Sequence, residues 1–172
     1  AIDLPVVGLV DDFYEPREGM KVTFVDTLTV SEYFELARFG QIELFEGGRP
    51  RQFTETAPPS VAGYTAHLEA LSRRRVIVDD DDNGQNVSLN DPNGSQFIYH
   101  PTANGGFSVG TQGSDFFRGG DLVSGLTGVL DWSFAGASGT DAWRIRPTAA
   151  NPATFTVANP RPATPPAVGG AI

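Results

Sequence analysis

The chain contains no cysteine, which excludes disulfide bridges, thiolate zinc sites and a cysteine nucleophile. It also lacks any apolar run near the roughly 20 residues that a helix needs to cross a bilayer, so we expect no membrane partner. Only two histidines are present, His67 and His100, and neither stands in a nucleophile–base or metalloprotease spacing. We therefore predict that this segment is not an enzyme and has no catalytic residues.

Positive charge is scarce as well. Lysine and arginine together number 12 against 21 aspartates and glutamates, which gives a formal net charge of −9. Such a balance opposes general attraction to a phosphate backbone and lowers the expectation of a stand-alone nucleic-acid binder. A local basic patch stays open as an alternative.

What is present favours one mainly β domain. The length of 172 residues suits a single domain, and 40% hydrophobic residues suffice for a core. The 20 glycines and 13 prolines predict many turns and little helix.

The most informative stretch is residues 121–134, DLVSGLTGVLDWSF, in which apolar residues alternate with others. Side chains on a strand point alternately to opposite faces, so we predict one long strand with an inward face that includes Leu126, Leu130 and Trp132. Gly125 and Gly128 predict a bulge or sharp bend. A long bent strand of this kind is typical of a small closed barrel.

Residues 20–30 show the same alternation and predict the first strand, with a bulge or kink at Asp26, the polar residue on the apolar side. Further strands are expected at residues 40–46, 51–54, 76–78 and 96–99, in a hairpin partner at residues 143–146, and at residues 155–157. One helix is expected after Ser60, a plausible N-cap, with Val61, Tyr64, Leu68 and Leu71 at helical spacing. It should end among residues 73–75.

The order of these strands and the helix along the chain predicts an OB-fold-like Greek-key β-barrel with one short helix and a long loop-rich insertion. A plain β-sandwich is the alternative fold. We expect a lead-in segment over the surface at residues 1–16 and the barrel at residues 17–158, with the insertion at residues 76–120. The Pro-rich residues 159–172 read as a linker toward a further C-terminal domain.

Several stretches resemble the segment that precedes the catalytic domain in bacterial extracellular nucleases of the ExeM/NucH type. They are EGMKV (residues 18–22), LTVS (28–31), FGQIEL (39–44), VIVDD (76–80), GDLVSGLTGVLD (120–131), WRIRPT (143–148) and NPRP (159–162). The series spans roughly residues 15–170, and the chain departs from the family pattern in an unusually acidic loop at residues 79–83.

The resemblance implies a non-catalytic accessory domain of a secreted, bacterial, extracellular DNA/RNA endonuclease. Its partner would be a C-terminal nuclease domain of the same polypeptide, dependent on magnesium, calcium or manganese. The domain would position that nuclease or its substrate. Alternatives are a calcium-stiffened spacer or interaction module, and an OB module that binds single-stranded nucleic acid.

The acidic loop suggests a calcium site. Counted from Asp79, the residues Asp81 and Asn83 fall on positions three and five of a calcium loop, and Gln85 follows. Position twelve is Asn90 rather than a bidentate glutamate, so a solvated acidic turn is the alternative. We carry Asp79, Asp81, Asn83 and Gln85 forward as candidate calcium ligands.

A basic stripe suggests nucleic-acid contact. OB-folds bind single strands in grooves where exposed aromatic rings stack on bases beside positive charge. The candidate contacts are Arg73, Arg74, Arg75, Trp143, Arg144 and Arg146. Against this, arginines at a helix end are common, and Trp132 and Trp143 both fit the inward face of their strands.

Overall fold

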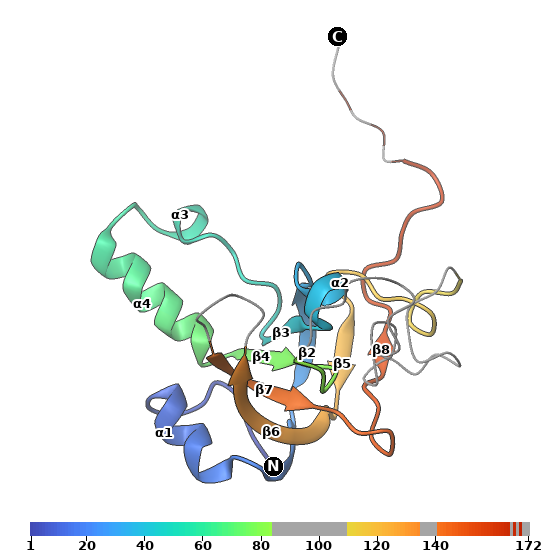
Figure 1. Cartoon of the computed structure of the whole chain (residues 1–172). Helices are drawn as coiled ribbons and strands as arrows, with labels where there is room; N and C mark the ends of the chain where they lie inside the picture. The colour runs from blue at the N-terminus through green and yellow to red at the C-terminus, as the bar shows by residue number, and fades with distance from the viewer. Residues whose placement is uncertain (84–109, 135–140, 166, 168, 170–172) are drawn as a thin grey trace.

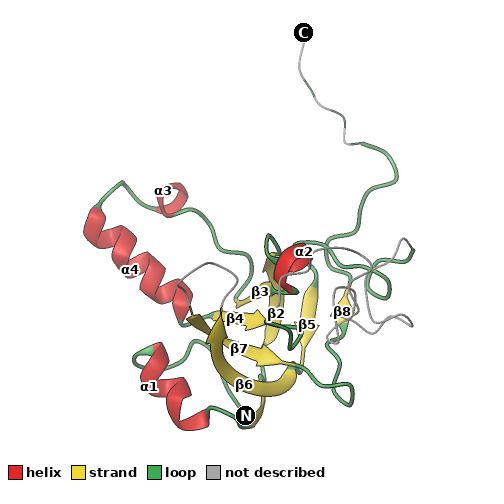
Figure 2. Cartoon of the chain, viewed as in Figure 1, coloured by secondary structure: helices red, strands yellow, loops and turns green. Residues whose placement is uncertain are grey.

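The computed structural model describes residues 1–83, 110–134, 141–165, 167 and 169, and its centre is one strongly curled eight-stranded β-sheet (Figure 1; Figure 2). The strands lie side by side in the order β1-β6-β7-β4-β3-β2-β5-β8. They are β1 (Lys21–Thr23), β2 (Thr27–Glu32), β3 (Ile42–Glu46), β4 (Arg75–Val78), β5 (Leu122–Ser124), β6 (Thr127–Phe134), β7 (Asp141–Arg146) and β8 (Phe155–Thr156). The expected mainly β class is confirmed.

Two bent segments, one early and one late, form much of this sheet. The early segment breaks between β1 and β2, where Asp26 Oδ2 accepts a hydrogen bond from the backbone N–H of Leu4 at 2.8 Å. The late segment breaks between β5 and β6 at Gly125, whose φ of +65° favours glycine. β1 pairs with β6 and β2 pairs with β5, both antiparallel. The bends predicted at Asp26 and Gly125 are confirmed. Because both segments bend, they stay paired on either side of the bend, through β1–β6 and β2–β5.

The turn at Gly125 also changes which side chains face the core. Val123 before it and Leu126 and Leu130 after it are all buried, although they differ in parity. Trp132 is 42% exposed, so its expected inward position is wrong. Its cross-strand partner Trp143 packs against Tyr14 and takes the covered place, which leaves Trp132 at the rim.

The strand β4 lies in the middle of the sheet, between antiparallel β3 and parallel β7. Val76 and Val78 are buried core residues. The strand predicted at residues 76–78 is therefore confirmed as β4. The strand expected at residues 96–99 lies outside the described residues.

The helices are short except for one. They are α1 (Val10–Tyr14), the 3₁₀ helix η1 (Glu15–Arg17), α2 (Leu36–Phe39), α3 (Phe53–Thr56) and α4 (Val61–Ser72). Ser60 caps α4, because its Oγ accepts the N–H of Gly63 at 2.9 Å, as predicted. The strand expected at residues 51–54 is wrong: the chain leaves the sheet there, pairs with none of the described strands, and turns into α3 (Figure 1).

The two ends of the chain behave differently. Residues 1–16 were expected on the surface, but Ile2, Leu4 and Val6 are buried in the main core. Their alternation makes an extended segment whose apolar side faces inward, with Ile2 bridged to Phe24. Residues 159–165 carry neither helix nor strand and are exposed, and the chain runs away from the sheet (Figure 1).

Candidate functional site: a buried ion-pair network

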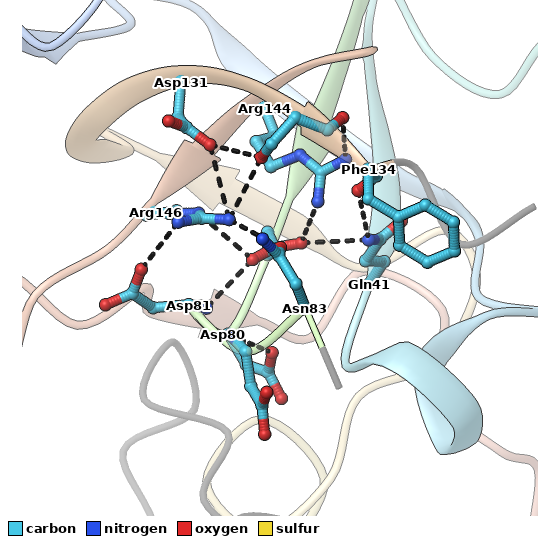
Figure 3. A network of polar contacts seen from close by, with 11 residues as sticks. Gln41, Asp80, Asp81, Asn83, Asp131, Phe134, Arg144 and Arg146 are labelled. Carbon is cyan, nitrogen blue, oxygen red and sulfur yellow. Dashed lines mark hydrogen bonds and ion pairs between the residues drawn. The ribbon is translucent and has the colours of Figure 1, made fainter. Parts of the chain in front are cut away.

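The most unusual chemistry of the fold lies where β4 and β7 end side by side (Figure 3). Parallel pairing sets Val78 beside Ile145, and the next residue, Asp79, donates its backbone N–H to the Ile145 carbonyl at 2.9 Å. Arg144 Nη1 then reaches Asp79 Oδ2 at 2.7 Å, and both side chains are completely shielded from solvent. Gln41 Nε2 donates to the same oxygen at 2.9 Å. The strand register alone therefore places two opposite charges in contact inside the protein.

Burial and pairing act on these groups in opposite directions. Burial raises the pKa of the Asp79 carboxyl, whereas the nearby Arg144 and Arg146 guanidiniums and the N–H of Asp81 oppose that rise. Burial likewise lowers the pKa of Arg144, and Asp79 opposes that fall. Each charge is therefore tolerated only because of the other, which is the pattern of a structural pair.

Arg146 occupies the centre of the loop that suggested calcium. Its Nη1 lies 2.9 Å from Asp81 Oδ1, its Nη2 lies 2.8 Å from Asn83 Oδ1, and its Nε lies 3.4 Å from Asp79 Oδ1. Nη2 also lies 3.3 Å from Asp131 Oδ2. The oxygens at loop positions one, three and five thus converge on a guanidinium.

This geometry bears on the four candidate calcium ligands. Asp79, Asp81 and Asn83 do come together, as the spacing suggested, but around the Arg146 side chain (Figure 3). Gln85 lies outside the described residues. Within the described part of the chain, no group of three histidine, aspartate or glutamate side chains is arranged to hold a metal ion. A bound cation at these oxygens would first have to displace Arg146.

The next residue, Asp80, is also buried. One of its oxygens accepts the N–H of Asp82 at 3.1 Å, and the carboxyl packs against Gly40. Burial raises the pKa of Asp80 to about 7; the Asp82 N–H opposes this, and the charges of Asp79 and Asp82 add to it. A carboxyl with this pKa can exchange protons near neutrality.

The arginines among the candidate nucleic-acid contacts each lie beside an acidic side chain. Arg73 lies 3.8 Å from Glu69, Arg74 lies 3.2 Å from Glu46, and Arg75 lies 3.3 Å from Glu43. Arg144 is fully buried, so its expected place on a solvent-facing stripe is wrong: the parallel β4–β7 register turns it onto Asp79. Trp143 is also buried, and its indole N–H donates to Asp11 at 2.9 Å.

Asp121 forms a second polar centre, to which the sequence patterns assigned no role. Its carboxylate accepts from Gln112 Nε2 at 2.8 and 3.0 Å, and from the backbone N–H groups of Arg118, Ala158 and Asn159 at 2.8, 3.0 and 3.1 Å. Burial by itself would raise the pKa of Asp121, but these donors outweigh it and hold the pKa below its ordinary value.

The donors to Asp121 come from three places in the chain. Gln112 and Arg118 also donate to the Asn159 carbonyl, at 3.0 and 2.9 Å, and Asn159 Nδ2 donates to the Gly119 carbonyl at 2.6 Å. The point where the Pro-rich tail leaves the sheet is therefore fixed on both sides by hydrogen bonds. Asp121 and Asn159 both lie in stretches that carry the family resemblance, residues 120–131 and 159–162.

His67, the histidine that the structure describes, takes no part in these centres. His67 lies on α4, with its ring 5.7 Å from that of Phe53, and His100 lies outside the described residues. Among the helices that are described, none combines the length and apolarity that crossing a membrane requires. Comparison of the chain with protein-family models, curated proteins and solved structures finds no match.

Proposed function

We propose that this chain is a non-catalytic accessory domain of a secreted metal-dependent DNA/RNA endonuclease, and that it positions the nuclease domain that follows it. The Asp121 centre carries this proposal. A domain that orients its neighbour must hold the residues that lead to that neighbour, because a flexible exit would transmit no orientation. Here one buried carboxylate holds Ala158 and Asn159 at the start of the exposed tail.

The strand pairing supports the OB-like part of the proposal. Each bent segment counts as one barrel strand, β1 with β2 and β5 with β6. The neighbours then run from the early segment through β3, β4 and β7 to the late segment, which pairs again with the early one. Five strands that return to the first are the arrangement expected of an OB-like barrel.

The charge pairing favours positioning over a direct grip on nucleic acid. Binding along a phosphate backbone requires positive groups that phosphates can reach. The arginines of the candidate stripe instead face Glu69, Glu46, Glu43 and the aspartates of the network. We therefore rank single-strand binding by this domain below its positioning role.

Two experiments test the proposal. Sequencing the reading frame beyond residue 172 should find a metallonuclease domain, and the chain by itself should cleave neither DNA nor RNA with magnesium, calcium or manganese. Cleavage by the isolated, pure chain would overturn the non-catalytic assignment.

The second experiment uses the full polypeptide. Asp121→Ala should loosen the spacing between the two domains, seen as a broader distance distribution in small-angle scattering, while Asp12→Asn, an exposed carboxyl on α1, should not. An unchanged distribution in a folded Asp121→Ala protein would contradict the positioning role.

A further inference from the structure

A small pocket with an aromatic wall opens between α1, the end of α4 and the β6–β7 pair. Its volume is about 220 Å³. The residues used below are Asp11, Ser72, Arg75, Trp132, Asp141 and Trp143. None of them belongs to the buried network or to the Asp121 centre.

The aromatic wall is built from two indoles. Trp132 and Trp143 are cross-strand partners with ring centroids 5.1 Å apart and ring planes tilted by 55°. Trp143 is fixed from behind by Tyr14, at 5.8 Å, and by its hydrogen bond to Asp11. Trp132 lies on this fixed base and stays 42% exposed. The pocket thus offers the exposed indole of Trp132 to solvent, packed against Trp143.

The rest of the lining is polar and of mixed sign. Asp11 and Asp141 supply carboxylates, while Arg75 and Ser72 supply donors. Arg75 also contacts Glu43 at 3.3 Å, which leaves the pocket without an excess of positive charge. Acceptors and donors around an aromatic face suit a ring that is apolar on one side and carries hydroxyl groups at its edge.

We propose that this pocket binds one ring of a neutral saccharide, stacked on Trp132 with its hydroxyls hydrogen-bonded to Asp141 and Arg75. The volume is below that of pockets for drug-sized ligands and fits a single ring. The two carboxylates repel phosphates, so a nucleotide fits poorly, and Arg75 opposes a bare organic cation. This proposal is independent of the positioning role.

The chain has only two tryptophans, so its indole N–H signals in a ¹H–¹⁵N spectrum are two, and Trp132→Ala identifies them. Neutral oligosaccharides (cellohexaose, maltohexaose, xylohexaose and chitohexaose) are titrated to about 10 mM, enough to occupy most of a site with a Kd near 1 mM. At least one of them should shift the Trp132 signal saturably.

Three variants check the assignment. Trp132→Ala, followed on the remaining Trp143 signal, should lower the affinity about tenfold or more, and Asp141→Asn about threefold or more. Phe34→Ala, which removes an aromatic ring 82% exposed elsewhere on the surface, should leave it unchanged. Far-UV circular dichroism confirms that each variant folds.

Three results would overturn the proposal: no shift with any of the four oligosaccharides, equal affinity in Trp132→Ala, or tighter binding of a thymidine oligonucleotide or of choline than of every saccharide. The second would place the sugar elsewhere, and the third would assign the pocket to bases or cations.

Discussion

Arg144 and Asp79 face each other across the parallel pair formed by β7 and the end of β4, with Nη1 and Oδ2 2.7 Å apart and neither side chain exposed. The Asp79 carboxylate is complemented further, since Gln41 and Arg146 also reach it. The contact links the end of the fourth strand, β4, to the seventh strand, β7, across 65 residues of sequence. Its role is therefore to hold the curled sheet together.

Removing one member of this pair should destabilise the protein strongly. Arg144→Met leaves the buried Asp79 with less compensation, and we expect the free energy of unfolding to fall by about 3–5 kcal/mol. The double variant Asp79→Asn/Arg144→Met should recover a large part of that loss, because no unpaired charge stays buried. Urea denaturation measures both. A double variant whose loss equals the sum of the single losses would show that the pair is not coupled.

Arg146 should compete with calcium for the loop oxygens. In Arg146→Met the oxygens of Asp81 and Asn83 lose their guanidinium partner, so millimolar calcium should raise the melting temperature of this variant more than that of the unchanged protein. Arg161→Met, in the exposed tail, is the matched control. If calcium raises the unchanged protein's melting temperature equally, Arg146 does not compete with the ion.

Asp80 should make stability fall as pH rises. Its pKa is raised to about 7 in the folded protein, above the ordinary value of 3.8, so the folded form binds the proton more tightly. Its stabilising contribution is complete below pH 3.8 and is lost as pH rises through 7.

Asp80→Asn removes this titration. The stability of the unchanged protein relative to this variant should therefore drop by about 4 kcal/mol between about pH 4 and pH 8. Asp12→Asn, which changes an exposed carboxyl on α1, supplies the control. A difference that stays flat with pH would show that Asp80 has the same pKa folded and unfolded.

Alanine substitutions at Gly40 and Gly125 can distinguish the cost of backbone strain from the cost of a steric clash, because both glycines have the same φ of +65°. A Cβ at Gly40 would lie 2.0 Å from Asp80 Oδ2, whereas a Cβ at Gly125 would meet nothing within 4 Å. Gly125→Ala should cost about 1–2 kcal/mol from the left-handed backbone alone. Gly40→Ala should cost clearly more, as measured by thermal and urea unfolding. Equal losses would mean that the Asp80 carboxyl moves aside freely.

Much of the sheet was accessible from the sequence because strand periodicity is local. The alternation in residues 20–30 and 121–134 predicted both bent segments, and the breaks at Asp26 and Gly125 came from a polar residue and a glycine in an apolar pattern. The helix after Ser60 followed from its cap. The prediction of a strand at residues 51–54 was wrong because short polar stretches have little periodicity and take the structure that their surroundings allow.

The sequence by itself determined the classes of residue available: no thiols, few cations, many carboxylates and an acidic loop with ligand-like spacing. Only the tertiary structure decided the partners. The parallel register of β4 and β7 sent Arg144 and Arg146 into that loop, and the approach of residues 158–159 gave Asp121 its donors. Spacing along a chain does not encode which opposite charge will arrive from 65 residues away, because that depends on how distant strands pair.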